Sequence, residues 1–254
     1  MIFGKSQITY FVFGISGVLI SLIVSKICIE IFNTIPAKWL CEYNEKPDDE
    51  LLMERLFMNP HGIIITIGLT LSYIFLYFQY NGYNFYFYMF YIAAVILFLI
   101  SISDCKYFII PNQFTFVLLI LAAVTVCYDN LSGKHIFYSD FISPIYGGLC
   151  GLLIMFALAS LGKLQFKKEA MGLGDIKLFG VIGIIVGFPH IFIVFLLTIF
   201  SSFFYILYLL IRKRLTKSLY IPLGPYICFS LLVFLLFRKQ LNYFIVWYLS
   251  LFNV

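Results

Sequence analysis

Charged side chains are scarce in this chain of 254 residues: they make up 11%, whereas hydrophobic residues make up 63%. The mean hydropathy is accordingly high, at +1.01. Soluble globular domains carry about 25% charged residues, so this composition excludes that class. We therefore expect an all-α, polytopic integral membrane protein, with membrane lipid around most of the chain. The net charge of +5 is too small to indicate a nucleic-acid partner.

The chain also lacks the cysteine and histidine patterns of metal sites and disulfide frameworks. None of its six cysteines forms a C-x-x-C pair, and most lie in apolar runs, where cysteine behaves as a small hydrophobe. Its three histidines, His61, His135 and His190, are not clustered in the sequence. We therefore expect no disulfide framework, no metal site and no cofactor.

Long apolar runs are what the chain has instead, and a transmembrane helix needs about 20 such residues. We predict about eight spans, at residues 8–33, 62–79, 84–103, 113–128, 142–161, 176–189, 191–211 and 221–237. The first run is too long for a signal peptide and has no A-x-A site, so we expect it to be retained. The sixth is short for a span, and the apolar tail 242–252 either lies in the interface or extends the last helix. The loops leave no room for a second soluble domain, so residues 1–254 are predicted to form a single membrane-embedded domain.

Lysine and arginine gather in alternate loops, which predicts the orientation in the membrane. Twelve of them lie in four loops that share one side, and four lie on the other side. The twelve are in loops 34–60, 104–112, 162–177 and 212–220. We expect this side to face the cytoplasm of a cell membrane and the N-terminus to lie outside.

Two aspartates stand at span ends, where a carboxylate is costly and marks a candidate functional site. Asp104 closes the third predicted span and Asp175 opens the sixth. Two spans separate them, so both lie at the same membrane face. Two adjacent carboxyls share one proton, and such a pair activates water for peptide hydrolysis without a metal. The alternatives are purely structural roles: a helix N-cap for Asp175 and an ion pair with Lys106 for Asp104.

Glycines flank the residue before the second aspartate. Gly172 and Gly174 lack a Cβ, so their backbone is open to close approach, and an extended peptide could pair with it as an added strand. A flexible turn is the alternative. As an N-cap, Asp175 would also be held ionised by the helix dipole, which makes Asp104 the expected holder of the shared proton.

Three segments resemble the membrane aspartic proteases with a Gly-x-Gly-Asp motif, and among them the type IV prepilin peptidases. The segments are "DCKYFIIPNQ" (104–113), "MGLGDIKLFG" (171–180) and "IPLGPYICFS" (221–230). The resemblance covers the predicted catalytic core, about 84–237. It implies that Asp104 and Asp175 are catalytic. It also implies an active-site or substrate-backbone role for Gly172, Gly174, Lys177 and Pro111, and a supporting role for Gly224 and Pro225.

The resemblance implies an endopeptidase that removes the short basic leader from prepilins or pseudopilins at the cytoplasmic face. Many members carry two C-x-x-C pairs in the first cytoplasmic loop, but here loop 34–60 has only Cys41. Many also methylate the new N-terminus with S-adenosylmethionine, and this loop leaves open whether the chain does so. Asn112 and Leu223 are mild departures from the family pattern.

Other functions remain as alternatives. One keeps the chemistry with another substrate, as in preflagellin or presenilin-like proteases, although Ser103 stands where the latter have tyrosine. The other is a proton-coupled transporter that uses the paired carboxylates as a relay, which would place acidic residues near mid-membrane. The sequence names neither the exact substrate nor the oligomeric state.

Overall fold

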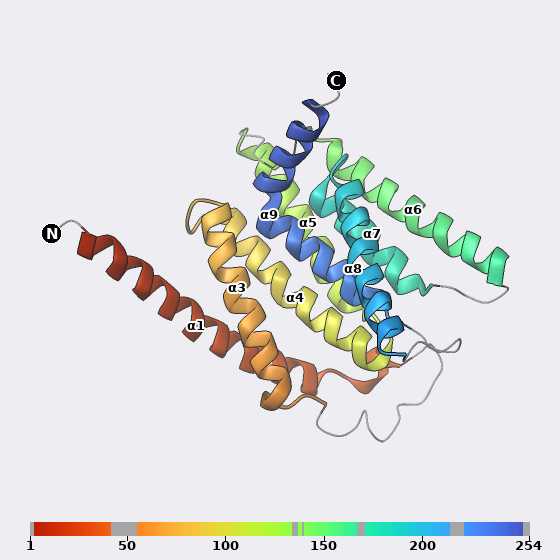
Figure 1. Cartoon of the computed structure of the whole chain (residues 1–254), viewed down its shortest axis with the longest axis horizontal. Coiled ribbons are helices and arrows are strands. Elements are labelled where there is room, and N and C mark those ends of the chain that lie inside the picture. The colour runs from red at the N-terminus through yellow and green to blue at the C-terminus, as the bar shows by residue number, and fades with distance from the viewer. Residues whose placement is uncertain are drawn as a thin grey trace. The chain divides into compact units, whose positions relative to one another are not determined.

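The computed structural model describes residues 3–41, 55–133, 137–138, 140–166, 171–213 and 221–250 (Figure 1). Over these residues the ordered elements are all helical. The α-helices are α1 Phe3–Thr34, α3 Ile63–Gln79, α4 Phe85–Tyr107, α5 Asn112–Leu131, α6 Ser143–Phe166, α7 Leu173–Val186, α8 Ile191–Ile211 and α9 Gly224–Ser250. Two short elements, the 3₁₀ helix η1 Ala37–Leu40 and the π-helix η2 Met58–Gly62, lie between α1 and α3. Several predicted loop charges, among them the acidic residues of 42–54, fall outside the described residues.

Seven of the described helices are long and apolar enough to cross a membrane. They correspond to seven of the eight predicted spans, and the all-α, polytopic fold is confirmed. The exception is α7, whose 14 residues extend about 21 Å, short of the roughly 30 Å of a hydrocarbon core. Large apolar side chains remain exposed along α8, such as Phe200, Phe204 and Ile211, as expected of a helix surrounded by lipid.

Two of the helix boundaries decide between alternatives that the sequence leaves open. The N-cap of α7 is Gly172, so the N-cap interpretation of Asp175 is wrong; this carboxylate lies within the first helical turn. At the other end of the chain, α9 continues to Ser250 past a non-helical residue at Phe237. The described part of the apolar tail therefore extends the last helix.

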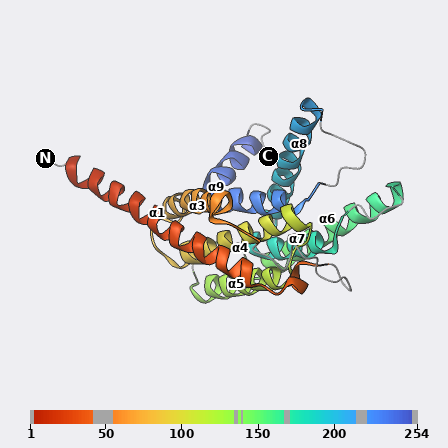
Figure 2. The same cartoon turned by 90° about the horizontal axis from the view of Figure 1, so that it is seen from below.

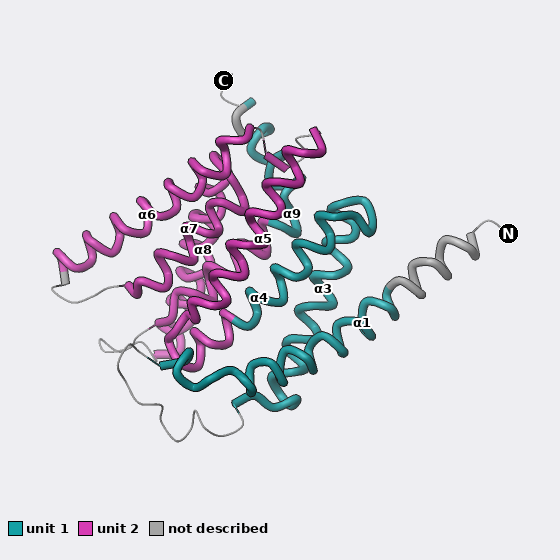
Figure 3. Tube along the Cα trace, turned by 180° about the vertical axis from the view of Figure 1, so that it is seen from behind, with its two compact units in different colours: residues 1–99, 235–254 teal, residues 100–234 magenta. Residues whose placement is uncertain are grey.

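The chain divides into two compact units (Figure 3). Unit 1 comprises Met1–Leu99 and Leu235–Val254, and unit 2 comprises Ile100–Phe234. Helices α4 and α9 each pass from one unit into the other. The second unit lies within the predicted core 84–237 and contains both aspartates, while the single-domain organisation stays a prediction.

Within unit 1, the loop after α1 is held by a buried arginine that the sequence suggested only as a topology signal. Arg55 is 5% exposed, and its guanidinium donates to the carbonyl oxygens of Phe32 and Ile35 at the C-terminal end of α1. A cation at this end of a helix complements its dipole. The side chain of Asn33 adds hydrogen bonds to the backbone of Arg55 and Leu56.

Within unit 2, α6 and α7 lie side by side in both views (Figures 1 and 2). Their closest approach is at glycines: a Cβ added to Gly147 would lie 2.2 Å from the carbonyl oxygen of Gly183, and one on Gly183 would lie 2.1 Å from that of Gly147. The spacing of the pairs Gly147-x-x-x-Gly151 and Gly183-x-x-x-Gly187 in the sequence predicts helix packing, and the structure confirms it. This packing fixes the helix that carries Asp175.

The far end of α7 is held by a buried acid near the end of α5. Asp129 is fully buried and accepts hydrogen bonds from the backbone N–H groups of Phe137 and Tyr138, each at 3.1 Å. The Tyr138 hydroxyl then donates to the Ile185 carbonyl at 2.9 Å. The hydropathy pattern predicts Asp129 in an outer loop at 129–141, and this prediction is wrong: Asp129 lies in α5 and fixes the backbone of Phe137 and Tyr138, which contacts α7.

Candidate active site

Asp104 lies in the last turn of α4 and is held by the start of α9. Its side chain is 6% exposed, and its Oδ2 accepts a 2.9 Å hydrogen bond from the backbone N–H of Gly224. Gly224 is the first residue of α9, where unpaired N–H groups favour a negative charge. A Cβ at Gly224 would lie 2.7 Å from this oxygen, so only glycine allows the contact. Pro225 follows as the second residue, a position at which its missing N–H costs nothing.

The segment between α4 and α5 folds tightly behind Asp104. The Ser103 hydroxyl donates to the Ile109 carbonyl at 2.7 Å, and the N–H of Phe108 donates to the Asp104 carbonyl at 3.0 Å. Phe108 takes a left-handed conformation with φ of 55°. Pro111 is the N-cap of α5 and its extended backbone ends the turn. It shapes this loop and directs the chain into α5.

Asp175 is the third residue of α7 and enters the site from the other side. It is 8% exposed, and its carboxylate is hydrogen-bonded by the backbone of Gly172, the N-cap residue. A carboxylate at this position can reach back to the N-cap N–H, as in the second half of a capping box. Its Oδ1 is buried and has no hydrogen-bond partner in the structure. An unpaired buried carboxylate oxygen is costly, so it marks a position for a water or a substrate group.

The structure brings the two predicted carboxylates together. Asp104 acts electrostatically on Asp175, and both act on the thiol of Cys228, which is buried in α9 one turn after Gly224. Cys228 was taken for an ordinary small hydrophobe, and only the fold shows that it adjoins the pair. Cys105, next to Asp104, is exposed.

The two glycines of the motif have different surroundings. Gly174 faces the loop after α4, where a Cβ would lie 3.1 Å from the Cβ of Ile110. Because Gly174 has no side chain, the loop between α4 and α5 can approach α7 closely. Gly172 is exposed and extended, with φ of −73° and ψ of 149°, and an added Cβ would meet only ordinary contacts. Of the two, only Gly172 has open backbone beside the carboxylates.

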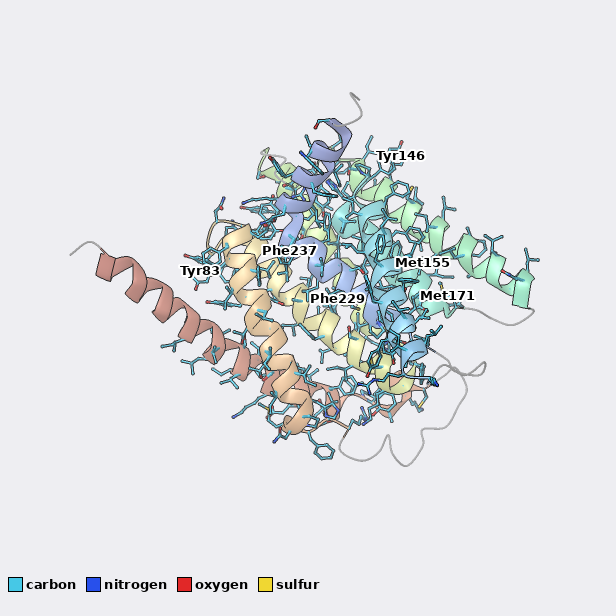
Figure 4. All side chains as sticks on the ribbon, in the orientation of Figure 1. Tyr83, Tyr146, Met155, Met171, Phe229 and Phe237 are labelled. Carbon is cyan, nitrogen blue, oxygen red and sulfur yellow. The ribbon has the colours of Figure 1, made fainter. Side chains whose placement is uncertain are left out.

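Lys177 does not join the carboxylates. Residues two apart on a helix point to different sides, and the Lys177 ammonium group donates to Asn112 Oδ1 on α5 at 3.2 Å. Figure 4 shows the neighbourhood: Met171 marks the start of α7, and Tyr146 marks the opposite end of the neighbouring α6. Across the described part of the chain, this site included, no three His, Cys, Asp or Glu side chains gather as metal ligands do.

Comparison with known proteins shows which family the sequence around this site resembles. Residues 91–210 match the type IV leader peptidase family. A prepilin leader peptidase/N-methyltransferase of Vibrio cholerae serotype O1 is 30% identical over 138 residues, which cover 54% of this chain and 51% of that protein. Proteins of the same description from Aeromonas salmonicida and Aeromonas hydrophila are 28% and 29% identical over 155 residues, covering 61% of this chain and 50% of theirs. No solved structure matches the chain at a significant level.

The chain spans about half the length of these relatives. The family match, residues 91–210, includes both aspartates. The loop of α4–α5 and the start of α7, which the motifs singled out, both lie within it. The resemblance inferred from the motifs is confirmed by this independent match. Residues 91–210, the segment that carries the paired carboxylates, are thus similar to the type IV leader peptidase family.

Proposed function

We propose that this chain is an aspartic endopeptidase that removes the short basic leader of type IV prepilins or pseudopilins. The observation that carries the proposal is the pair of buried carboxyls, Asp104 and Asp175, which helices far apart in the sequence bring within electrostatic reach of each other. Two carboxyls so placed act as one acid–base unit. The family match makes a prepilin leader the natural substrate class.

We assign the shared proton to Asp175 in the resting pair. The Gly224 N–H at the start of α9 stabilises a negative charge on Asp104. Asp175 also accepts a backbone hydrogen bond, from Gly172, but its buried Oδ1 has no donor, which disfavours the charged form of Asp175. This reverses the assignment expected from the dipole of α7 alone, because α9 supplies a second helix N-terminus that only the fold reveals. Ionised Asp104 then removes a proton from the attacking water, and the Asp175 hydroxyl donates a hydrogen bond to the scissile carbonyl.

The remaining proton transfers balance within the pair. Water adds to the carbonyl carbon, its proton goes to Asp104, and the carbonyl oxygen takes the proton of Asp175. When the C–N bond breaks, Asp104 passes its proton to the leaving amine and the new carboxyl returns one to Asp175. The pair thus ends as it began, and the reaction needs no covalent intermediate.

Infrared difference spectra test the proton assignment. We expect the C=O band of a protonated carboxyl group in the free protein, absent from Asp175→Asn and retained in Asp104→Asn. The reverse pattern, with the band lost only in Asp104→Asn, would show that Asp104 holds the proton. Asp140→Asn is the control, because Asp140 is exposed on the loop before α6.

The exposed backbone at Gly172 offers the substrate backbone a place to bind. Gly172 presents extended, exposed backbone next to Asp175, and an extended peptide can pair with it as an added strand. We propose that the leader side of the scissile bond lies there, and that this end of α7 faces the cytoplasm, as the lysine and arginine distribution suggests.

The proposed activity is tested by mixing the purified protein with a prepilin in membranes and determining the cut position by mass spectrometry. We expect one cut between the basic leader and the hydrophobic helix, and no cut in a precursor whose helix is replaced by a polar sequence. An uncut prepilin, with proton flux abolished by Asp104→Asn and Asp175→Asn, would favour the transporter instead. The same spectra, with S-adenosylmethionine added, show whether the new N-terminus gains a methyl group.

A further inference from the structure

A groove runs along the side of α7 that faces away from the carboxylates. It has a volume of about 530 Å³ and lies between α5, α6 and α7, all in unit 2. Its lining is apolar apart from Thr115 and from one end, where Lys177 and Asn112 form their hydrogen bond. The main apolar residues along it are Phe116, Leu119, Ile145, Leu149, Leu152 and Ile184. Among the described residues that line the groove none is acidic, and Lys177 is the one that carries a charge.

We propose that this groove binds an anionic phospholipid, with the phosphate on Lys177 and an acyl chain along the apolar walls. From Lys177 to Ile184 the helix rises about 10 Å, so the groove holds the part of an acyl chain nearest the headgroup. Phe116, Ile145 and Leu149 are 60%, 53% and 52% exposed, so the groove opens to the surroundings of unit 2. Among membrane components, a lipid with apolar acyl chains and one negatively charged headgroup matches this distribution of apolar surface and charge.

The position of Lys177 suits a phosphate group. It lies in the first turns of α7, where backbone and charge both favour an anion, and a lysine ammonium has three N–H donors, of which Asn112 accepts one. Asn112 fixes the ammonium at the mouth of the groove. A lysine near the membrane surface strengthens binding of an anionic lipid about five-fold.

The substrate's hydrophobic helix is the competing occupant, and the helix geometry disfavours it. At 100° per residue, Lys177, Val181 and Ile184 lie about 180–240° around α7 from Asp175. The groove and the carboxylates are therefore on opposite sides of this helix. In addition, a whole helix is about 10–12 Å across, whereas pockets of this volume are typical of small ligands.

Tryptophan quenching by brominated lipid tests the proposal. The natural tryptophans, Trp39 and Trp247, are replaced by phenylalanine, and a new one is placed in the groove by Phe116→Trp. The matched control is Phe203→Trp on α8, since Phe203 is 54% exposed and does not line the groove. Each protein is reconstituted in phosphatidylcholine with increasing brominated phosphatidylglycerol or brominated phosphatidylcholine, and the relative binding constant is obtained from the quenching.

We expect the groove tryptophan to prefer phosphatidylglycerol about five-fold, and the α8 tryptophan to show no preference. Adding Lys177→Gln should abolish the preference, and Lys177→Arg should keep it. Equal quenching at both positions, or a preference that survives Lys177→Gln, would overturn the proposal. So would displacement of the brominated lipid by a prepilin helix at the groove alone, because the groove would then be the substrate's. This readout needs no cleavage, so it fails or succeeds independently of the proposed peptidase activity.

Discussion

At the scale of single residues, the site depends on a backbone N–H that reaches a carboxylate. Gly224 approaches Asp104 so closely that a methyl group has no place between them. From the sequence, the even number of predicted spans between Asp104 and Asp175 made them candidates for a pair, because it places both at the same membrane face. The hydrogen bond from Gly224 was not predictable, because it depends on how the start of α9 meets the end of α4.

Gly224→Ala tests this contact. The added methyl would lie 2.7 Å from Asp104 Oδ2 and 3.0 Å from its Cγ, so the carboxylate must move and lose its hydrogen bond. We expect kcat to fall at least about tenfold, as losing about 1.5–3 kcal/mol from a charged hydrogen bond implies. Steady-state cleavage of a prepilin measures this effect.

The control for that change is Gly14→Ala in α1, where an added Cβ has no neighbour within 4 Å. It should cleave at the wild-type rate. Unaltered kcat in Gly224→Ala would mean that Asp104 does not need this hydrogen bond. The contacts of Asp129 were not predictable from the sequence either. The hydropathy pattern predicts Asp129 in an outer loop, because its partners, Phe137 and Tyr138, meet it only in the fold.

At the scale of helices, α7 is the element that the rest of unit 2 positions. Its sequence predicted a short helix from about 176, and the structure begins it at Leu173. The three extra residues matter because they place Asp175 inside the first turn. Boundaries of this kind depend on capping by Gly172, which a hydropathy pattern does not report, whereas the small-residue packing against α6 was readable from the spacing of the glycines.

Gly147→Ala and Gly183→Ala should each destabilise the protein by about 1–3 kcal/mol. The reason is that a Cβ at either position would overlap a backbone carbonyl of the facing helix, and backbone cannot move aside as a side chain can. Thermal unfolding in detergent measures the loss. Leu153→Ala on α6 is the control, since Leu153 is 65% exposed; a similar loss in that variant would mean that the glycine contact is not what holds α7.

At the scale of the whole molecule, composition alone established a membrane protein, because a chain so poor in charge cannot cover itself with polar surface. Composition could not establish the number of crossings, since α7 is mostly apolar yet too short to span by length. Arg55 shows the limit of counting charges: it contributes to the predicted cytoplasmic side, and the structure buries it against α1.

Cysteine labelling tests the proposed orientation. In a variant whose only cysteine is Cys105, near the α4–α5 loop, an impermeant maleimide should label inside-out vesicles and not intact cells. In a variant whose only cysteine comes from Ser132→Cys, just after α5, it should label intact cells. These opposite patterns are expected because α5 separates the two positions by one membrane crossing. Labelling of both positions from the same side would contradict the crossing, and the reversed pattern would place the carboxylates at the outer face.

The most direct test of the central claim is the rate of prepilin cleavage by Asp104→Asn, Asp175→Asn, the double variant and the exposed control Asp140→Asn. Because the two carboxyls act as one unit, each single variant should lose about 10²–10⁴-fold in kcat/KM, and the double variant should lose little more. Asp140→Asn should match the wild type. Retained cleavage in either single variant, or losses that multiply in the double variant, would contradict the account.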